Sequence, residues 1–157
     1  MFRDVTTLFH NAQAWSAAIQ ELANKAKEFD VQSVAGIEAR GFVVAAPLSI
    51  ELDVGFVPIR KSGKLPAATL GREYELEYGR DRVEVHQDAF PSGQRVLVVD
   101  DLIATGGTAL ATIELIKETG ATVAGTMFLI DLPELGGSRK IRESGIESFS
   151  LMTFPGH

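Results

Sequence analysis

The segment RVLVV at residues 95–99, together with the two apolar segments after it, constrains the fold of this chain more than any other feature. A short, β-branched apolar run of this kind predicts a strand buried on both faces of a parallel sheet. A helix is predicted over residues 108–119, ended by Gly120, and a second strand over residues 122–130. Strand, helix and strand at this spacing indicate a βαβ unit and therefore an α/β fold.

The rest of the chain repeats this alternation. After Asn11, which suits a helix N-cap, apolar residues recur every three or four positions as far as Phe29 and predict a helix. Strands are predicted over residues 31–37, 54–59 and 148–152, and helices over residues 40–52 and 137–143. Pro47 should kink or terminate the helix over residues 40–52, because proline lacks an N–H group and clashes with the preceding turn.

Residues 61–87 interrupt the alternation of helices and strands. Polar and apolar residues alternate over residues 74–78 and again over 83–85, and Gly79, Arg80 and Asp81 between them favour a turn. This pattern predicts a protruding β-hairpin, which we call the flap. The predicted fold is thus a central, mainly parallel sheet flanked by helices, with the flap inserted.

Composition limits the classes of protein to consider. A chain of 157 residues, 45% of them hydrophobic, can bury one substantial core, so we expect one domain over residues 1–157. The net charge of −6 disfavours a general nucleic-acid binder, because phosphate backbones require a basic face. The apolar run at residues 41–50 contains proline and is far shorter than the roughly 20 residues that cross a bilayer. With no cysteine and no signal-peptide pattern, the chain is expected to be cytoplasmic, with neither nucleic acid nor membrane as a partner.

Two acids and a glycine-containing loop come after the strand over residues 95–99. Asp100 and Asp101 are directly next to it, and ligands of open parallel sheets bind at the carboxyl ends of the strands. The loop consists of Ala104, Thr105, Gly106, Gly107 and Thr108. Its glycines let backbone N–H groups converge on an anion, its threonines add hydroxyl donors, and the next helix adds its dipole. The loop is therefore predicted to bind a phosphate.

The surrounding residues narrow the choice of ligand. A P-loop does not fit, since no Lys lies between Arg95 and Ile116, and a dinucleotide fingerprint does not fit, since Gly106-Gly107 does not supply its glycine spacing. Carboxylates beside the loop would repel a phosphate, but they accept hydrogen bonds from the vicinal hydroxyls of a ribose. Either pair alone could be an ordinary capped strand-to-helix connection. Together they favour a ribose 5-phosphate site.

The stretch VLVVDDLIATGGT resembles the ribose-phosphate signature of the type I phosphoribosyltransferases. Further stretches extend the resemblance along the chain: FRDVT at residues 2–6, EARGF at 38–42, PIRKSGKLP at 58–66, YELEYG at 74–79 and FPGH at 154–157. EARGF and LEYG are more specific than the TGGT loop, and the combination is similar to the members of the family that use adenine. The resemblance implies the type I fold and transfer of the phosphoribosyl group of phosphoribosyl pyrophosphate to adenine, which gives AMP in purine salvage.

Cationic residues are candidates for binding the pyrophosphate of that substrate. Arg40 opens a helix after a strand, where its guanidinium suits bidentate phosphate contact, although a solvated Arg at a helix start is equally common. By resemblance it belongs to the pyrophosphate-binding loop. Arg60, Lys61 and Lys64 concentrate positive charge in an acidic chain, which would compensate an anionic substrate. Lys61 is the candidate pyrophosphate ligand among them.

The resemblance supplies the roles of three further residues. Arg3 would contact the adenine base. Glu77, on the flap, would serve as the acid/base near the purine, although an exposed Glu is commonplace in a hairpin. Tyr78 would cover the site as the flap closes, and a closed lid excludes water from a hydrolysable intermediate.

The resemblance also implies a cofactor and a partner. Mg²⁺ is implied by the leaving pyrophosphate, because this ion binds mainly through phosphates and water, and no direct protein ligand is predicted. A homodimer is implied in the same way. Three alternatives stay open. The first is a related enzyme that uses hypoxanthine, guanine or xanthine, and the second is a non-catalytic sensor of phosphoribosyl pyrophosphate. The third is an enzyme that is inactive because it lacks the N-terminal segment that family members usually carry.

Overall fold

The computed structural model describes residues 4–76 and 78–156, and within them a seven-stranded sheet has the order β3-β4-β2-β1-β5-β6-β7. The strands are β1 (Ser33–Ile37), β2 (Gly55–Lys61), β3 (Thr69–Glu75), β4 (Arg80–His86), β5 (Arg95–Ile103), β6 (Thr122–Asp131) and β7 (Ser148–Thr153). From β2 through β1, β5 and β6 to β7 all pairs are parallel, whereas β4 is antiparallel to β2 and β3 to β4. The predicted α/β class, with a mainly parallel sheet and an added hairpin, is confirmed.

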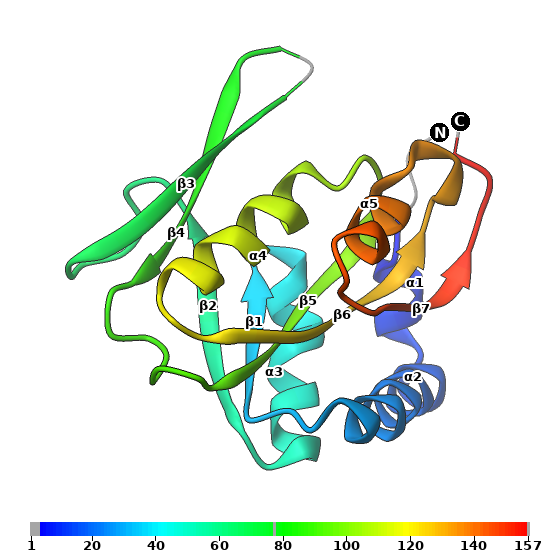
Figure 1. Ribbon diagram of the computed structural model, residues 1–157. Helices are drawn as coiled ribbons and strands as arrows, with labels where there is room; N and C mark the ends of the chain where they lie inside the picture. Colours follow the sequence, from blue (N-terminus) through cyan, green and yellow to red (C-terminus); the bar gives the residue numbers. More distant parts are fainter. Residues whose placement is uncertain (1–3, 77, 157) are drawn as a thin grey trace.

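Helices cover both faces of the sheet (Figure 1). They are α1 (Thr6–His10), α2 (Ala12–Ala26), α3 (Arg40–Leu52), α4 (Gly107–Glu118) and α5 (Gly137–Glu143), with short 3₁₀ turns at Lys27–Phe29 and Pro133–Leu135. Apolar residues of α1, α2 and α3 pack on one face, which includes Leu97 and Val99 of β5. Those of α4 and α5 pack on the other, which includes Val96 and Val98. Residues 96–99 are fully buried, as a strand between two layers of helices requires.

Of two residues predicted to mark helix ends, Asn11 does so and Pro47 does not. Asn11 caps α2 as predicted, because its side-chain Oδ1 accepts a hydrogen bond from the Ala14 N–H at 3.0 Å. Pro47 was predicted to kink or terminate its helix, and it does not terminate it, since α3 continues to Leu52. An interior proline costs about 3 kcal/mol, whereas burial of an apolar side chain contributes about 1.5–3 kcal/mol. The burial of Val44 and Leu48 on α3 therefore outweighs the lost hydrogen bond.

Strand β5 and the flap turn also differ from the sequence prediction. The strand is predicted to end at residue 99, but β5 continues to Ile103, so both acids lie within it. It continues because β6 extends equally far, which places Asp100 opposite Phe128 and Ile103 opposite Asp131. The hairpin turn is predicted over residues 79–81, but β4 already begins at residue 80. The turn closes one step earlier, where the Leu76 N–H donates to the Gly79 carbonyl at 3.0 Å.

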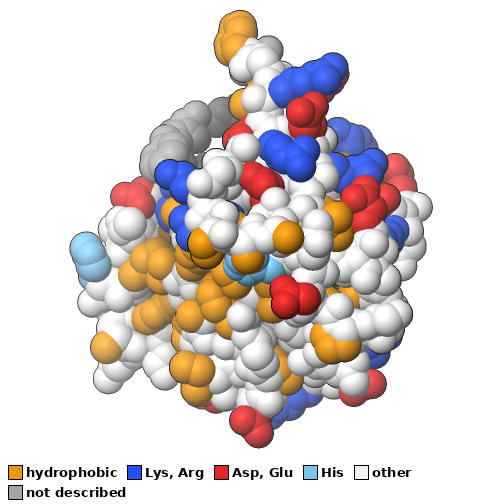
Figure 2. Space-filling model, turned by 90° about the vertical axis from the view of Figure 1, so that its left-hand side faces the viewer, with side chains coloured by type: hydrophobic (Ala, Val, Ile, Leu, Met, Phe, Trp, Pro, Cys, Tyr) orange, Lys and Arg blue, Asp and Glu red, His pale blue; other side chains and the backbone are white. Residues whose placement is uncertain are grey.

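The flap, strands β3 and β4, projects from one edge of the sheet (Figure 1). Side chains of both charges gather over it at the top of Figure 2, and Arg80 lies 3.7 Å from the carboxylates of both Glu73 and Glu75. The base of the flap is joined to α4 by an ion pair of 2.6 Å between Arg72 and Glu118. Within the described ranges, every helix is too short or too polar to cross a membrane.

Candidate active site

A pocket of about 360 Å³ lies at the carboxyl end of β5, next to the last residues of β3. It is lined by Tyr74, Glu75 and Leu76 of the flap, by Asp100, Leu102 and Ile103 of β5, and by residues 104–109. Asp100 and all five residues of the predicted phosphate loop therefore face one cavity. The sequence predicted this juxtaposition, whereas the contribution of Tyr74 and Leu76 from the flap was not predicted.

The loop over residues 104–108 has a backbone shape that suits an anion. Gly106 has a φ of +88°, a left-handed conformation that glycine adopts without strain, and it directs the chain into α4. Among the described residues no side chain caps α4, so the first-turn amides are not taken up by a capping group. Their N–H groups and the helix dipole favour a phosphate at this position.

Residues of α5 support the back of this loop. The Gly137 N–H donates to the Ala104 carbonyl at 3.0 Å, and the Lys140 Nζ donates to the Thr105 carbonyl at 3.4 Å. A Cβ atom on Gly137 would lie 2.6 Å from the Ala104 carbonyl oxygen, so this approach requires glycine. Sequence reasoning missed both residues, although the pair Gly136-Gly137 after β6 was a signal for close backbone packing.

Asp100 is a half-buried carboxylate beside a buried one. Its Oδ1 accepts a hydrogen bond from the Asp101 N–H at 2.8 Å. Burial, followed by the negative charge of Asp101, raises the pKa of the Asp100 carboxyl well above its ordinary value. A shifted pKa of this origin in a cleft is typical of functional carboxyls.

Asp101 does not line the pocket with Asp100, and it meets Arg40 instead. The Arg40 Nε donates to Asp101 Oδ2 at 2.5 Å, and this bond, with the Asp101 charge, raises the pKa of Arg40. The Asp101 side chain is 7% exposed, whereas that of Arg40 is 54% exposed. The two residues that the sequence assigns to the ribose and to the pyrophosphate thus contact each other.

The turn that carries Arg40 is tied to the end of β2. The peptide bond between Glu38 and Ala39 is cis. Glu38 Oε1 accepts hydrogen bonds from the Lys61 backbone N–H at 2.7 Å and from Arg60 Nε at 3.0 Å. This positioning role of Glu38 was not predicted, although the EARGF stretch was recognised as a unit.

Lys61 points toward the flap in this structure. Its Nζ donates to the Tyr74 hydroxyl at 2.5 Å and to Asp81 Oδ2 at 2.9 Å. The bond from Lys61 also lowers the pKa of the Asp81 carboxyl. Because Tyr74 lines the pocket, Lys61 lies next to the candidate site without itself lining it.

The remaining predicted site residues belong to the flap tip and the N-terminus. Tyr78 is 86% exposed and is not among the residues that line the pocket. Arg3 and Glu77 lie outside the described residues.

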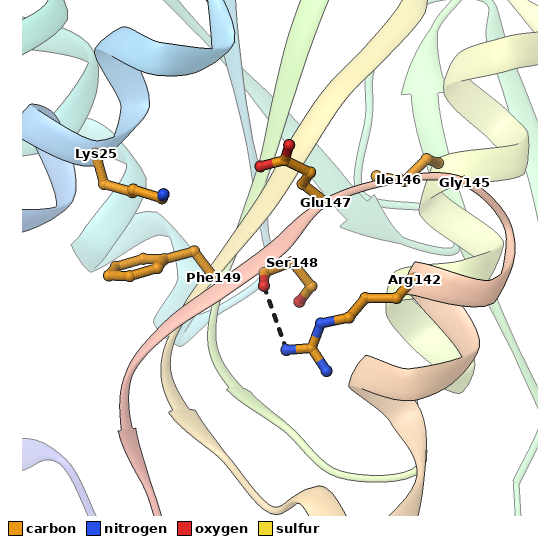
Figure 3. A pocket seen from close by; sticks show the side chains of 7 residues that line it. All are labelled: Lys25, Arg142, Gly145, Ile146, Glu147, Ser148 and Phe149. Carbon is orange, nitrogen blue, oxygen red and sulfur yellow. Dashed lines mark hydrogen bonds between the residues drawn. The ribbon is translucent and has the colours of Figure 1, made fainter.

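A second hollow lies at the opposite, amino edge of the sheet, where β7 begins (Figure 3). Lys25, Arg142 and Glu147 line it together with Phe149, and the Lys25 ammonium lies 5.6 Å from the Phe149 ring centroid. Arg142 donates to the Ser148 carbonyl at 3.3 Å. None of the residues predicted for substrate binding lines this hollow.

The fold and the site agree with one family of known proteins. A family model described as the phosphoribosyl transferase domain matches residues 5–147. With its parallel sheet, its glycine-containing loop after β5 and its inserted hairpin, the chain belongs to the phosphoribosyltransferase family.

Relatives narrow the assignment within that family. The adenine phosphoribosyltransferase of Nitrosospira multiformis is 54% identical over 157 residues, which are 100% of this chain and 90% of the relative. The crystal structure of the enzyme of that name from Thermoanaerobacter pseudethanolicus has a TM-score of 0.93 and 46% identity, and covers 98% of this chain and 88% of its own. The Giardia lamblia enzyme complexed with 9-deazaadenine has a TM-score of 0.92 and 31% identity, covering 99% and 87%. Within the family, the chain belongs to the adenine phosphoribosyltransferases, as its motifs predicted.

Proposed function

We propose that this chain transfers the 5-phosphoribosyl group of phosphoribosyl pyrophosphate to adenine, with AMP and pyrophosphate as products, in purine salvage. The observation that carries the proposal is the pocket in which Asp100 and residues 104–108 face one another beneath the flap. The Asp100 carboxylate suits the hydroxyl groups of a ribose 5-phosphate, and the loop over residues 104–108 suits its phosphate. The high identity to adenine phosphoribosyltransferases supports adenine as the acceptor.

The ribose phosphate would be held rigidly at this pocket. The amides of the loop and the hydroxyls of Thr105 and Thr108 would bind the 5-phosphate, and the Asp100 carboxylate would accept a hydrogen bond from the ribose. Displacement at the anomeric carbon develops positive charge on the sugar. The half-buried Asp100 carboxylate beside that carbon would stabilise the charge as it forms.

The leaving pyrophosphate needs positive charge at the other end of the substrate. Arg40 and Lys61 would supply it, Arg40 from the start of α3 and Lys61 after turning away from Asp81. Closure of the flap would bring Glu77 to the purine as the acid/base and place Tyr78 over the site. Exclusion of water by the closed flap would protect the reactive sugar from hydrolysis.

We further propose that Mg²⁺ enters with the substrate. Within residues 4–76 and 78–156, no three His, Asp or Glu side chains lie together as a metal site. Phosphate oxygens and water would therefore hold most of the ion, and Asp100 and Glu75 are the carboxylates that line the pocket. Bound Mg²⁺ would neutralise charge on the departing pyrophosphate.

The finer features of the assignment are proposals of the same kind. Contact between Arg3 and adenine is proposed from the family resemblance, whereas a cytoplasmic location and a single domain over residues 1–157 are proposed from the composition and length of the chain. A homodimer is supported by Val43 and Ile50 on α3, which are 43% and 79% exposed. Apolar side chains exposed together on one helix suit a contact with a second copy.

The test is product formation by the full chain with phosphoribosyl pyrophosphate and Mg²⁺, offering adenine, hypoxanthine and guanine separately. We expect AMP from adenine and no nucleotide from the other two bases. Product from hypoxanthine or guanine would favour the related enzymes. Binding of phosphoribosyl pyrophosphate without product from any base would favour a sensor, and it would overturn the proposed activity.

A further inference from the structure

We propose that Lys140 is a positioning residue for the predicted phosphate loop, and that it acts through the Thr105 carbonyl to direct backbone N–H groups at the 5-phosphate. The inference rests on the proposed function and deepens it, because it concerns how the loop is prepared for that phosphate. It is carried by the contacts between the loop and α5, which lies beside the start of α4 in Figure 1.

The first step is that α5 holds two consecutive carbonyl groups of the loop. The Ala104 carbonyl accepts a hydrogen bond from the Gly137 N–H at 3.0 Å, and the Thr105 carbonyl accepts one from Lys140 Nζ at 3.4 Å. In a trans peptide unit the C=O and the N–H point in opposite directions. The N–H groups of the same two units, which belong to Thr105 and Gly106, therefore point away from α5. Because both residues line the pocket, these donors would be available to a phosphate there.

The second step is the shape of the backbone at Gly106. Its φ of +88° and ψ of 2° are left-handed, and a left-handed residue in a turn makes successive N–H groups converge on one anion. A Cβ atom on Gly106 would lie 2.8 Å from Gly137 Cα, and one on Gly137 would lie 2.6 Å from the Ala104 carbonyl oxygen. Loop and helix thus pack backbone to backbone, so the loop cannot change shape unless α5 moves with it.

The third step is the balance of charge around the loop. The chain has a net charge of −6, no Lys or Arg lies between residues 95 and 117, and Asp100 lines the same pocket. A phosphate at this position therefore needs positive charge from another part of the fold. Lys140 brings an ammonium group to the back of the loop. A cation on the Thr105 carbonyl polarises its peptide unit and makes the Gly106 N–H a stronger donor.

Calorimetric binding of ribose 5-phosphate to a series of Lys140 variants tests the proposal. Lys140→Met removes both the donor and the charge, Lys140→Gln keeps a neutral N–H donor, and Lys140→Arg keeps the donor and the charge. We expect binding to weaken about tenfold for Met and less for Gln, and to stay within about twofold for Arg. Lys140 is exposed, so these variants should fold. Thermal unfolding checks each of them, and Lys140→Gln decides the matter if Lys140→Met is unstable.

Lys117→Met is the matched control. Lys117 lies in the last turn of α4, is 44% exposed and forms an ion pair of 3.5 Å with Glu114, away from the loop. We expect this variant to bind ribose 5-phosphate within about twofold of the parent, because an exposed ion pair contributes little. A loss as large as that of Lys140→Met would overturn the proposal, since any lysine would then have the same effect.

The amide signals of the ligand-free, ¹⁵N-labelled chain separate positioning from a general structural role. We expect Lys140→Met to move the signal of Gly106, whose peptide unit loses its partner, and Lys140→Arg to restore it. Weaker binding by Lys140→Met without a change at Gly106 would overturn the proposal, as would unchanged binding by both Lys140→Met and Lys140→Gln. Failure of the proposed function would look different, because then the unmodified chain would not bind ribose 5-phosphate.

Discussion

Gly41, the second residue of α3, packs directly against Asp100 of β5. A Cβ atom added at Gly41 would lie 3.0 Å from Asp100 Oδ1 and 3.0 Å from the Val99 carbonyl oxygen. Such distances leave no room for a side chain, so the start of α3 rests on the strand that carries the two acids. The helix that bears Arg40 and the strand that bears Asp100 and Asp101 are therefore held at a spacing that glycine permits.

Substitution of Gly41 by alanine should disturb this spacing. Overpacking costs about 1–3 kcal/mol, which exceeds the gain of up to about 1 kcal/mol that alanine brings to a helix. We expect Gly41→Ala to lower the free energy of unfolding and to weaken ribose 5-phosphate binding, measured by denaturant titration and calorimetry. Gly55→Ala is the control, because a Cβ there would meet nothing within 4 Å. Equal behaviour of the two variants would show that the contact tolerates a methyl group.

Asp100 should make stability fall as pH rises. Burial and the Asp101 charge raise its pKa well above the 3.8 of an ordinary Asp, so above that pH the folded chain binds more protons than the unfolded chain. Its contribution to stability is present below about pH 4 and is lost as pH rises through the folded pKa. Asp100→Asn should therefore be more stable than the parent at about pH 7, by a margin that shrinks toward about pH 4. Denaturant midpoints across this range measure the margin, and a pH-independent margin would contradict the argument.

The two glycines of the predicted phosphate loop should respond differently to alanine. At Gly106, with its φ of +88°, a Cβ would lie 2.8 Å from Gly137 Cα, whereas at Gly107 the nearest atom, Tyr74 Cδ2, is 3.5 Å away. A left-handed conformation costs a side chain about 1–2 kcal/mol before any clash is counted. We expect Gly106→Ala to abolish ribose 5-phosphate binding and Gly107→Ala to retain the fold. Thermal unfolding together with binding of that probe distinguishes them, and a Gly106→Ala variant that binds normally would refute the required loop shape.

Glu84 should stabilise the base of the flap in a pH-dependent way. This residue, 8% exposed, accepts hydrogen bonds from the Gly63 N–H at 2.7 Å and the Thr69 hydroxyl at 2.9 Å. These bonds, the one from Gly63 foremost, lower its pKa below 4.5. The stabilisation is therefore present above about pH 4.5 and is lost as pH falls through the lowered pKa. Glu84→Gln should lower the free energy of unfolding by about 1–3 kcal/mol at neutral pH and by less in acid.

Denaturant titration of Glu84→Gln at several pH values measures this effect. Glu73→Gln is the matched control, since Glu73 lies on the other flap strand and its side chain is 58% exposed. Exposed ion pairs contribute little, so we expect its stability to stay within about 1 kcal/mol of the parent. A loss for Glu73→Gln as large as that for Glu84→Gln would mean that general flap charge, and not the buried hydrogen bonds, is responsible.

The local order of elements could be predicted from the chain because it depends on neighbouring residues. The apolar run before Asp100 and the helix after Gly107 follow from side-chain pattern and from backbone preferences, and both are present. The end of β5 could not be predicted in this way. Aspartates are poor strand formers by themselves, but the ladder to β6 continues through Asp100 to Ile103.

By itself, the sequence determined the residue types of the site and their order: two acids, then a glycine loop, then a helix. Only the tertiary structure decided which residues meet: Arg40 with Asp101 across 61 positions, Lys140 with Thr105 across 35, and Lys61 with Tyr74 across 13. Local patterns determine periodicity and turns within a few residues. Contacts between distant residues depend on which strands become neighbours and which face each side chain takes. The packing of the whole sheet, and not any single motif, therefore separated Asp100 from Asp101.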